Sequence, residues 1–296
     1  MSGRRQPAPV PHKHEVLWPG GDPDTTARDT PTTRRRDFLI PRESGPVPGT
    51  VWIPAAAPTL TPAPTSTPEP PSPPLPGPLP LVLLSHGGSG TRHSTRVTQM
   101  AALLTRSGLA AAAIDGPYHG ERVAKPLTPA EYQSRIAAEG IGTVLDRTAG
   151  DWRATRDVLV EAGIADPERL AYFGLSFGTR YGIAAAAALG SGSEPGLRCA
   201  VLGKFGVQES PDLHPGLHAP QRTLRDAARI AAPVLFHMQW DDELFPRAGQ
   251  LELFDSFPSP AKELHAFPGG HRHTPDHAPL LWHDFLFRHL APGPPK

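Results

Sequence analysis

The fold of this 296-residue chain is decided by the stretch Arg169-Leu-Ala-Tyr-Phe-Gly174-Leu-Ser176-Phe-Gly178-Thr-Arg-Tyr-Gly182. A short apolar run, typical of a buried strand, precedes Gly174, and an alanine-rich segment, typical of a helix, follows Gly178. In that context the pattern Gly-x-Ser-x-Gly predicts a nucleophile elbow, a sharp and strained strand-to-helix turn that exposes the hydroxyl of Ser176. The N-terminus of the following helix would face the serine and stabilise negative charge that develops there.

Outward from this stretch, apolar strand patterns alternate with helical patterns. Strands with few polar residues, separated by helices, predict an α/β fold with a mostly parallel sheet and helices on both faces. The loops that follow the strands then gather at one edge of the sheet, where sites form in such folds. We predict strands at 36–40, 50–53, 81–84, 109–115, 169–173, 199–202, 234–238 and 262–267, and helices at 96–107, 129–138, 143–162, 177–189, 224–231, 247–256 and 279–290.

Composition divides the chain into a body and low-complexity segments. Residues 1–33 lack periodicity and are predicted to be a disordered or extended N-terminal segment, which leaves 34–296 as a single domain. Within that domain, 54–80 is rich in Pro, Ala, Thr and Ser and is interpreted as a surface insertion between two strands. Residues 118–147 are long for a connection and could form a small lid.

Charge and hydropathy exclude several classes of partner. The formal net charge is +0 and the sequence pI is about 7.3, so no basic field exists to attract nucleic acid or anionic lipid. No stretch reaches the ~18 apolar residues of a membrane span, and the N-terminus lacks the apolar region of a secretory signal. The only cysteine, Cys199, lies in an apolar run and suits a buried strand. We therefore expect a cytoplasmic protein; the sequence indicates no oligomeric state.

A nucleophilic serine needs a histidine base and an acid that orients the histidine. The acid is expected after the predicted strand 234–238, where Asp241 and Asp242 are adjacent. Asp242 has the favoured position relative to the flanking prolines, Asp241 is the alternative, and both could instead only cap the next helix.

The base is expected after the predicted strand 262–267. His271 follows two glycines there, with His273 and His277 close by as alternatives. The same histidines, with Asp276, could suggest a metal site, but their spacing does not place four ligands in a tetrahedron, and we predict no metal.

An oxyanion hole requires two backbone N–H groups that point at the developing charge. One is expected from Phe177, directly after the serine. The other is expected from the His86-Gly87-Gly88-Ser89 loop, most favourably from Gly88, with Ser89 as the alternative. A phosphate-binding role for this loop is disfavoured because it lacks the Gly-Lys-[Ser/Thr] sequence. After the strand 109–115, Tyr118 and His119 could line the pocket or belong to a structural turn.

At these motifs the chain resembles the α/β-hydrolase superfamily, closest to its dienelactone-hydrolase and acetyl-esterase branch. The matching stretches are 83–90, 114–122, 151–182, 234–246 and 267–271. The resemblance implies an α/β-hydrolase fold with an eight-stranded sheet, a Ser176–His271–Asp242 triad and ester hydrolysis without a cofactor. Dienelactone hydrolases use a cysteine nucleophile where this chain has Ser176, which argues against that particular substrate. Thr179, where many esterases have a smaller residue, is expected to narrow the pocket.

Together, the motifs predict a serine hydrolase that cleaves a small-molecule carboxylic ester through an acyl-enzyme intermediate. A peptidase or acyltransferase of the same fold would carry the same elbow, so both remain alternatives. A catalytically silent hydrolase fold that binds a partner through 54–80 is the alternative from another class.

Overall fold

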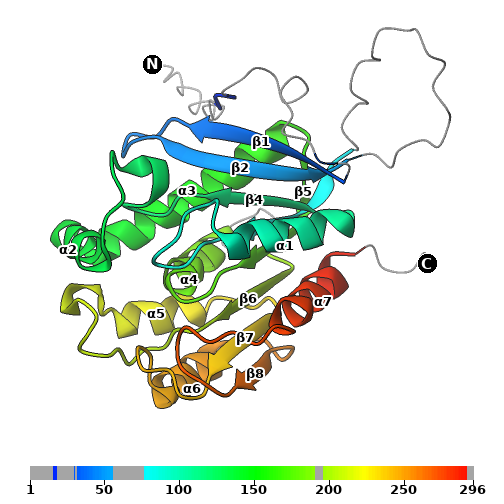
Figure 1. Ribbon diagram of the computed structural model, residues 1–296. Coiled ribbons are helices and arrows are strands. Elements are labelled where there is room, and N and C mark those ends of the chain that lie inside the picture. Colours follow the sequence, from blue (N-terminus) through cyan, green and yellow to red (C-terminus); the bar gives the residue numbers. More distant parts are fainter. Residues whose placement is uncertain (1–15, 19–29, 31, 56–76, 191–195, 292–296) are drawn as a thin grey trace, which may run out of the picture.

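The computed structural model describes residues 16–18, 30, 32–55, 77–190 and 196–291 (Figure 1). Within them, eight strands form one sheet in the order β1-β2-β4-β3-β5-β6-β7-β8. β2 pairs antiparallel with β1 and with β4, and every pair from β4 to β8 is parallel. The strands are β1 (Thr33–Ile40), β2 (Val47–Pro54), β3 (Leu79–Leu84), β4 (Ala110–Ile114), β5 (Ala165–Phe173), β6 (Cys199–Gly203), β7 (Val234–Gln239) and β8 (Glu263–Phe267).

The central strands are buried on both faces, as their unbroken apolar sequences require. Successive side chains of a strand point to opposite faces. Leu81 and Leu83 of β3 accordingly pack in one core cluster, whereas Val82 and Leu84 pack in the other. The sheet therefore separates two hydrophobic cores.

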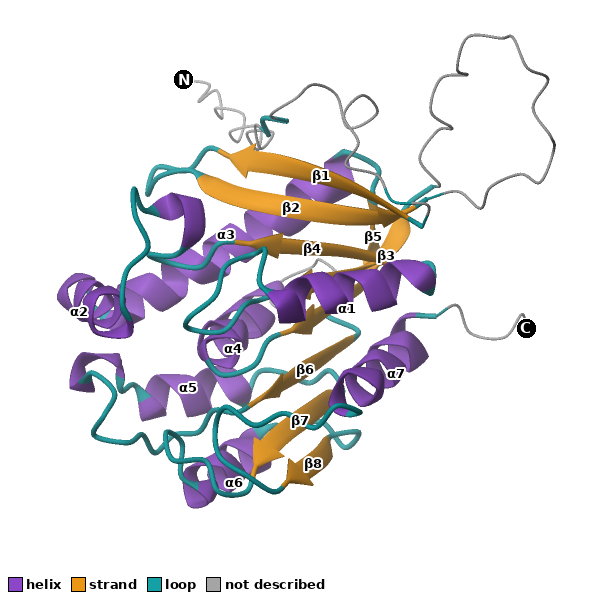
Figure 2. Cartoon of the chain, in the orientation of Figure 1, coloured by secondary structure: helices purple, strands orange, loops and turns teal. Residues whose placement is uncertain are grey.

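Helices cover each core in a separate layer (Figure 2). α1 and α7 pack on one face, and α3, α4, α5 and α6 pack side by side on the other. α2 contacts α3 and the short helix η2 at the edge of that second layer. The helices are α1 (Thr95–Arg106), η1 (Gly120–Arg122), α2 (Pro129–Glu139), α3 (Ile141–Glu161), α4 (Phe177–Leu189), η2 (Pro215–Leu217), α5 (Pro220–Ala227), α6 (Arg247–Ser256) and α7 (Ala278–Leu290).

This architecture confirms the predicted mostly parallel sheet with helices on both faces. The predicted helix 224–231 is wrong in position, because α5 begins at Pro220 and ends at Ala227. Proline at the first helical turn has its φ preset for a helix and loses no hydrogen bond there, so it starts the helix earlier than the apolar pattern suggested.

The predicted segments are only partly described. Residues 1–15, 19–29, 31 and 56–76 lie outside the described residues, so the N-terminal segment and most of the insertion 54–80 stay predictions. The stretch 118–147 contains η1, α2 and the start of α3, and its role as a lid also stays a prediction.

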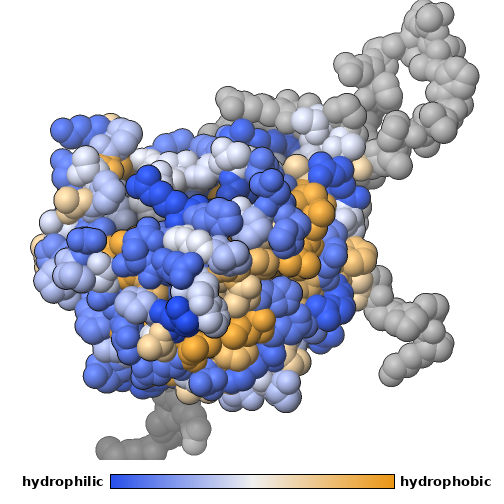
Figure 3. Space-filling view, turned by 60° about the horizontal axis from the view of Figure 1, so that its bottom comes forward, coloured by the Kyte–Doolittle hydropathy of each residue, from blue (hydrophilic) through white to orange (hydrophobic). Residues whose placement is uncertain are grey.

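On the face that Figure 3 presents, hydrophilic residues predominate and apolar residues form separate patches. Across the described part of the chain, no helix combines the length and apolar character needed to cross a membrane.

Candidate active site

Ser176 occupies the predicted turn between β5 and α4 in a strained backbone conformation. Its φ is 59° and its ψ is −116°, a region that non-glycine residues rarely adopt. Among the described residues, only Tyr118 and Lys204 join it as non-glycine residues with positive φ. The three follow β4, β5 and β6, at the same edge of the sheet. Backbone strain of this kind clusters at functional sites, so the three residues indicate a functional site at this edge of the sheet.

The glycines of the elbow allow very close backbone approach. A Cβ on Gly174 would lie 2.7 Å from the carbonyl oxygen of Gly178, and a Cβ on Gly178 would lie 3.1 Å from the Cβ of Ser85. The Ser176 N–H donates to the carbonyl of Gly203 on β6 at 2.9 Å. The sharp turn is thus fixed between its own helix and the neighbouring strand.

Thr179 does not narrow the pocket as expected, because its side chain is completely buried. Its hydroxyl lies 2.7 Å from the carbonyl oxygens of both Gly174 and Gly203, and it accepts the Gly203 N–H at 2.8 Å. The hydroxyl ties the elbow to β6, which explains a polar residue at this position.

Thr179→Val should therefore destabilise the fold by about 1–3 kcal/mol, since the same-shaped side chain leaves buried polar groups without a partner. Urea denaturation measures this loss. Thr179→Ser keeps the hydroxyl and is the matched control, expected to lose less. Equal losses in the two variants would contradict the account of the hydroxyl.

The structure brings Ser176, His271 and Asp242 into one hydrogen-bonded chain. Ser176 Oγ lies 2.8 Å from His271 Nε2, and His271 Nδ1 lies 2.9 Å from Asp242 Oδ2. The Asp242 side chain is completely buried, and its other oxygen accepts the N–H groups of Leu244 and Phe245 at 2.9 Å. A carboxylate held in this way selects the histidine tautomer with hydrogen on Nδ1, which leaves Nε2 to accept from the serine.

The neighbouring candidates lie elsewhere. Asp241 Oδ2 accepts the N–H of Gly269 at 3.2 Å, whereas the hydrogen bond to the histidine ring comes from Asp242. His273 Nδ1 lies 3.1 Å from the carbonyl oxygen of Pro268, and the His277 ring packs edge-on against Phe267. Among the described residues, no group of three or more His, Cys, Asp or Glu side chains is arranged to hold a metal ion.

The loop expected to supply the second oxyanion donor is held by two histidines. His86 accepts the Gly116 N–H on Nε2 at 2.9 Å, so its Nδ1 donates to the carbonyl of Gly87 at 2.7 Å. Burial, with the neighbouring His119, lowers the pKa of His86 to about 4, which keeps this ring neutral near pH 7. His119 Nε2 lies 2.9 Å from the carbonyl oxygen of Gly88.

Gly88 lies beside Phe177, the other expected donor. A Cβ on Gly88 would be 3.7 Å from the Cβ of Phe177 and 2.6 Å from the hydroxyl oxygen of Tyr132 on α2. The Phe177 N–H opens α4, where the first amides of a helix have no partner within the helix. Since a trans peptide sets C=O and N–H on opposite sides, the Gly87 carbonyl bond turns the Gly88 N–H away from the His86 ring.

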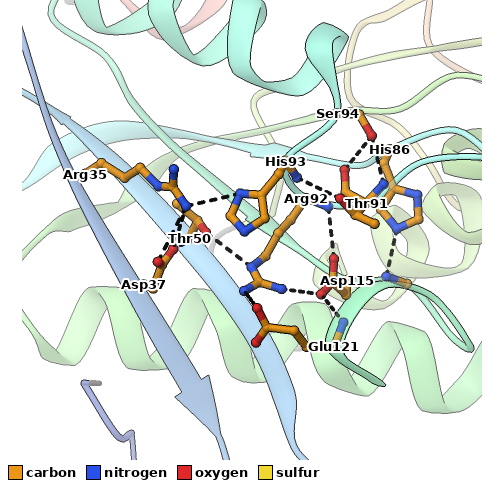
Figure 4. Close-up of polar contacts among 11 residues, drawn as sticks. Arg35, Asp37, Thr50, His86, Thr91, Arg92, His93, Ser94, Asp115 and Glu121 are labelled. Carbon is orange, nitrogen blue, oxygen red and sulfur yellow. Dashed lines mark hydrogen bonds and ion pairs between the residues drawn. The ribbon is translucent and has the colours of Figure 1, made fainter. Parts of the chain in front are cut away.

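A buried ion pair anchors the far end of this loop (Figure 4). The Arg92 guanidinium pairs with the fully buried Asp115 and with Glu121, while Asp115 accepts the backbone N–H of Arg92 at 2.9 Å and of Glu121 at 3.0 Å. Thr50 of β2 accepts from Arg92 Nε at 3.3 Å. The loops after β3 and β4 are therefore locked together behind the site.

Sequence reasoning missed two residues that hold the segment of His271. Glu243 Oε2 accepts the backbone N–H of His271 at 2.7 Å, a bond that lowers the pKa of Glu243. Lys204 Nζ donates to the carbonyl of His271 at 3.0 Å. A lysine directly after a predicted parallel strand and a glycine was the available signal for Lys204.

A pocket of about 390 Å³, with four charged side chains in its lining, lies next to Tyr118. Tyr118 lines it and donates its hydroxyl to Glu139 at 2.6 Å, but Ser176, His271 and Asp242 do not line it. The complete lining is Ser44, Gly45, Pro46, Tyr118, Glu121, Arg122, Glu139 and Arg147.

Comparison with solved structures returns the same fold. A cold-adapted esterase from an Arctic intertidal metagenomic library is similar over 93% of this chain and 99% of its own, with a TM-score of 0.71 and 29% identity. The acetyl xylan esterase from Paenibacillus sp. R4 is similar over 94% of this chain and 89% of its own, with a TM-score of 0.64 and 18% identity. The dienelactone hydrolase from Anabaena variabilis ATCC 29413 is similar over 88% of this chain and 99% of its own, with a TM-score of 0.56 and 17% identity. No protein-family model and no curated protein matches the chain.

The sheet order and these structures define the chain as a protein with the α/β-hydrolase fold. The solved structures similar to this chain include an esterase, an acetyl xylan esterase and a dienelactone hydrolase, so the resemblance in fold that the motifs predicted is confirmed. Because these neighbours are esterases and hydrolases, the comparisons support a hydrolase.

Proposed function

We propose that this protein is a serine hydrolase that cleaves a small-molecule carboxylic ester through an acyl-enzyme intermediate. The observation that carries the proposal is the hydrogen-bonded chain from Ser176 Oγ through His271 to the buried Asp242. The strained backbone of Ser176 and the 29% identical esterase support it independently.

In the acylation step, Ser176 Oγ attacks the ester carbonyl while its proton passes to His271 Nε2. Asp242 then stabilises the imidazolium through the bond to Nδ1. The N–H groups of Phe177 and Gly88 donate to the oxyanion, which the N-terminus of α4 also stabilises. The C–O bond to the alcohol breaks, and the leaving oxygen takes the proton from His271.

Deacylation repeats the same steps with water as the nucleophile. His271 Nε2 removes a proton from a water molecule, whose oxygen attacks the acyl carbon. Collapse of the second tetrahedral intermediate releases the acid and returns the proton to Ser176 Oγ.

A turnover screen tests the proposed function directly. We expect hydrolysis of p-nitrophenyl esters, with a maximum at one acyl chain length, and much slower turnover of matched anilides and lactones. Preferred cleavage of the anilide would favour a peptidase, and acyl transfer to an added alcohol in preference to water would favour an acyltransferase. A folded protein inert to all these substrates and to a fluorophosphonate probe would contradict the proposal.

Gly88→Ala should lower kcat by on the order of 10²-fold, the usual cost of losing an oxyanion donor, because the new Cβ would lie 2.6 Å from the hydroxyl oxygen of the buried Tyr132, and the loop must shift wherever the packed tyrosine does not. Gly87→Ala is the matched control, since nothing lies within 4 Å of its Cβ, and it should retain activity within a few-fold.

The double variant Gly88→Ala/Tyr132→Phe tests whether the loss of kcat in Gly88→Ala comes from the clash between the new Cβ and the Tyr132 hydroxyl. It removes the hydroxyl oxygen and leaves the next ring atom at an ordinary 3.6 Å, so most of the lost kcat should return. A double variant as slow as Gly88→Ala, or a Gly88→Ala enzyme as fast as the wild type, would contradict this placement of Gly88.

A further inference from the structure

The side chain of Lys204 ends among three oxygen atoms of the segment that carries His271. Its Nζ lies 3.0 Å from the carbonyl oxygen of His271, 2.5 Å from that of His273 and 2.6 Å from Thr274 Oγ1. The residue is 2% exposed. An ammonium group has three N–H donors, and each of them has an acceptor on this one segment.

The backbone of Lys204 is bound to the elbow. The preceding residue, Gly203, accepts the N–H of Ser176 at 2.9 Å. Its φ is 143°, and a Cβ there would lie 2.0 Å from the carbonyl oxygen of His237, so the position requires a glycine. Lys204 itself has a φ of 49°, and its N–H donates to the carbonyl of His237 at 2.8 Å. Two adjacent residues thus join the serine turn to the segment of His271.

We propose that Lys204 is a positioning residue, whose ammonium group holds the backbone of His271 at the distance from Ser176 that proton transfer requires. This inference rests on the proposed function. Glu243 binds the N–H of His271 and Lys204 binds its C=O, so both sides of the histidine backbone are held by charged groups. The imidazole is then confined by its backbone as well as by its bonds to Asp242 and Ser176.

A buried charge costs folding free energy, so a lysine at this position calls for a functional reason. Burial and the nearby Arg96 lower the pKa of Lys204 to about 8, while Asp242 and Glu243 act in the opposite direction. The titratable and charged groups that face the ammonium are Arg96 from α1, His237 from β7, Asp242 and Glu243 from the loop after β7, and His271 and His273 from the acceptor segment.

Deprotonation would remove one of the three bonds, because a neutral amine keeps two N–H donors and turns a lone pair toward an oxygen. We therefore expect kcat to fall as the pH rises through about 8. The unfolded lysine titrates near ~10.4, so between about pH 8 and that value the unfolded chain binds more protons. The titration of Lys204 therefore makes the free energy of unfolding rise with pH in this window. Because the fold becomes more stable there, unfolding driven by Lys204 does not explain the expected fall in kcat.

The variant Lys204→Met tests the proposal, and Lys262→Met is its matched control. Lys262 also donates to three oxygens, the carbonyls of Phe254, Asp255 and Phe257, each at 3.0 Å, but at the end of α6. Lys204→Met should lower kcat by on the order of 10- to 100-fold with KM within about three-fold, and should lack the alkaline fall near pH 8. Lys262→Met should keep the kcat and the pH profile of the wild type.

Thr274→Val provides a second arm that retains the lysine. Loss of one acceptor should lower kcat several-fold and move the alkaline fall to lower pH, because the buried ammonium is less well solvated. A folded Lys204→Met enzyme with wild-type kcat and the same alkaline fall would overturn the proposal. If Lys204→Met does not fold, a Thr274→Val enzyme whose kcat and pH profile match those of the wild type would also overturn the proposal. Failure of the wild type itself to turn over esters or to react with a fluorophosphonate would instead overturn the proposed function.

Discussion

Replacing Ser176 by alanine is expected to lower ester turnover by about 10⁴-fold or more and to abolish labelling by a fluorophosphonate probe. The variant removes only the oxygen atom that lies 2.8 Å from His271 Nε2. In the proposed mechanism Ser176 Oγ forms the acyl-enzyme, so the variant would keep only substrate binding and the oxyanion donors. Turnover is measured with the best p-nitrophenyl ester from the screen, and labelling is measured on the intact protein by mass spectrometry.

Ser259→Ala is the matched control for this experiment. Ser259 is also buried, but it lies between α6 and β8, where its hydroxyl accepts the N–H of Ala261 at 3.3 Å. It should label and turn over like the wild type. Undiminished labelling of Ser176→Ala would mean that the nucleophile is another residue.

The second large effect is expected at the acid. Asp242→Asn should lower kcat by on the order of 10⁴-fold, because the amide can donate to Nδ1 and so favours the wrong histidine tautomer while leaving the geometry nearly intact. Asp241→Asn should cost less than about ten-fold, since that side chain accepts only from the Gly269 backbone at 3.2 Å. Turnover of the two adjacent variants, with circular dichroism to verify folding, measures the difference. Equal losses would show that the carboxylate beside His271 does not act as the acid.

Much of this fold could be predicted because its local patterns agree with its tertiary structure. The helix predicted at 177–189 has those bounds in the structure, since the elbow glycines and the alanine run mark both ends. The apolar runs of β3 and β6 could only be buried strands. The helix predicted at 224–231 was misplaced because an apolar period does not say where a helix starts, and Pro220 does.

Residue type and chain order were enough to predict which strands carry the candidate site residues, but not which of two adjacent aspartates faces the histidine. Ser176, Asp242 and His271 follow strands whose carboxyl ends meet at one edge of the sheet, so their approach follows from topology. Asp242 rather than Asp241 faces the histidine because its other oxygen accepts two backbone N–H groups, which orients the carboxylate. That choice depends on backbone geometry that a two-residue pattern does not encode.

The supporting residues were beyond sequence reasoning for a physical reason. Lys204 and its acceptors are 67–70 positions apart, and a lysine in a loop after a glycine is usually solvated. Arg92 and Asp115 likewise come from two different loops and pair only once the sheet has formed. Thr179 was misread because its position in the motif suggested a pocket wall, whereas its hydroxyl serves the backbone of the elbow.

The nucleophilic role of Ser176 is tested by acid quenching of the enzyme during turnover of p-nitrophenyl acetate, followed by peptide mass spectrometry. We expect a burst of p-nitrophenol and one acetyl group on Ser176, with slower acetylation in Asp242→Asn. Steady turnover with acetyl found on another side chain, or with no acetylated peptide under any quench time, would contradict this role of Ser176.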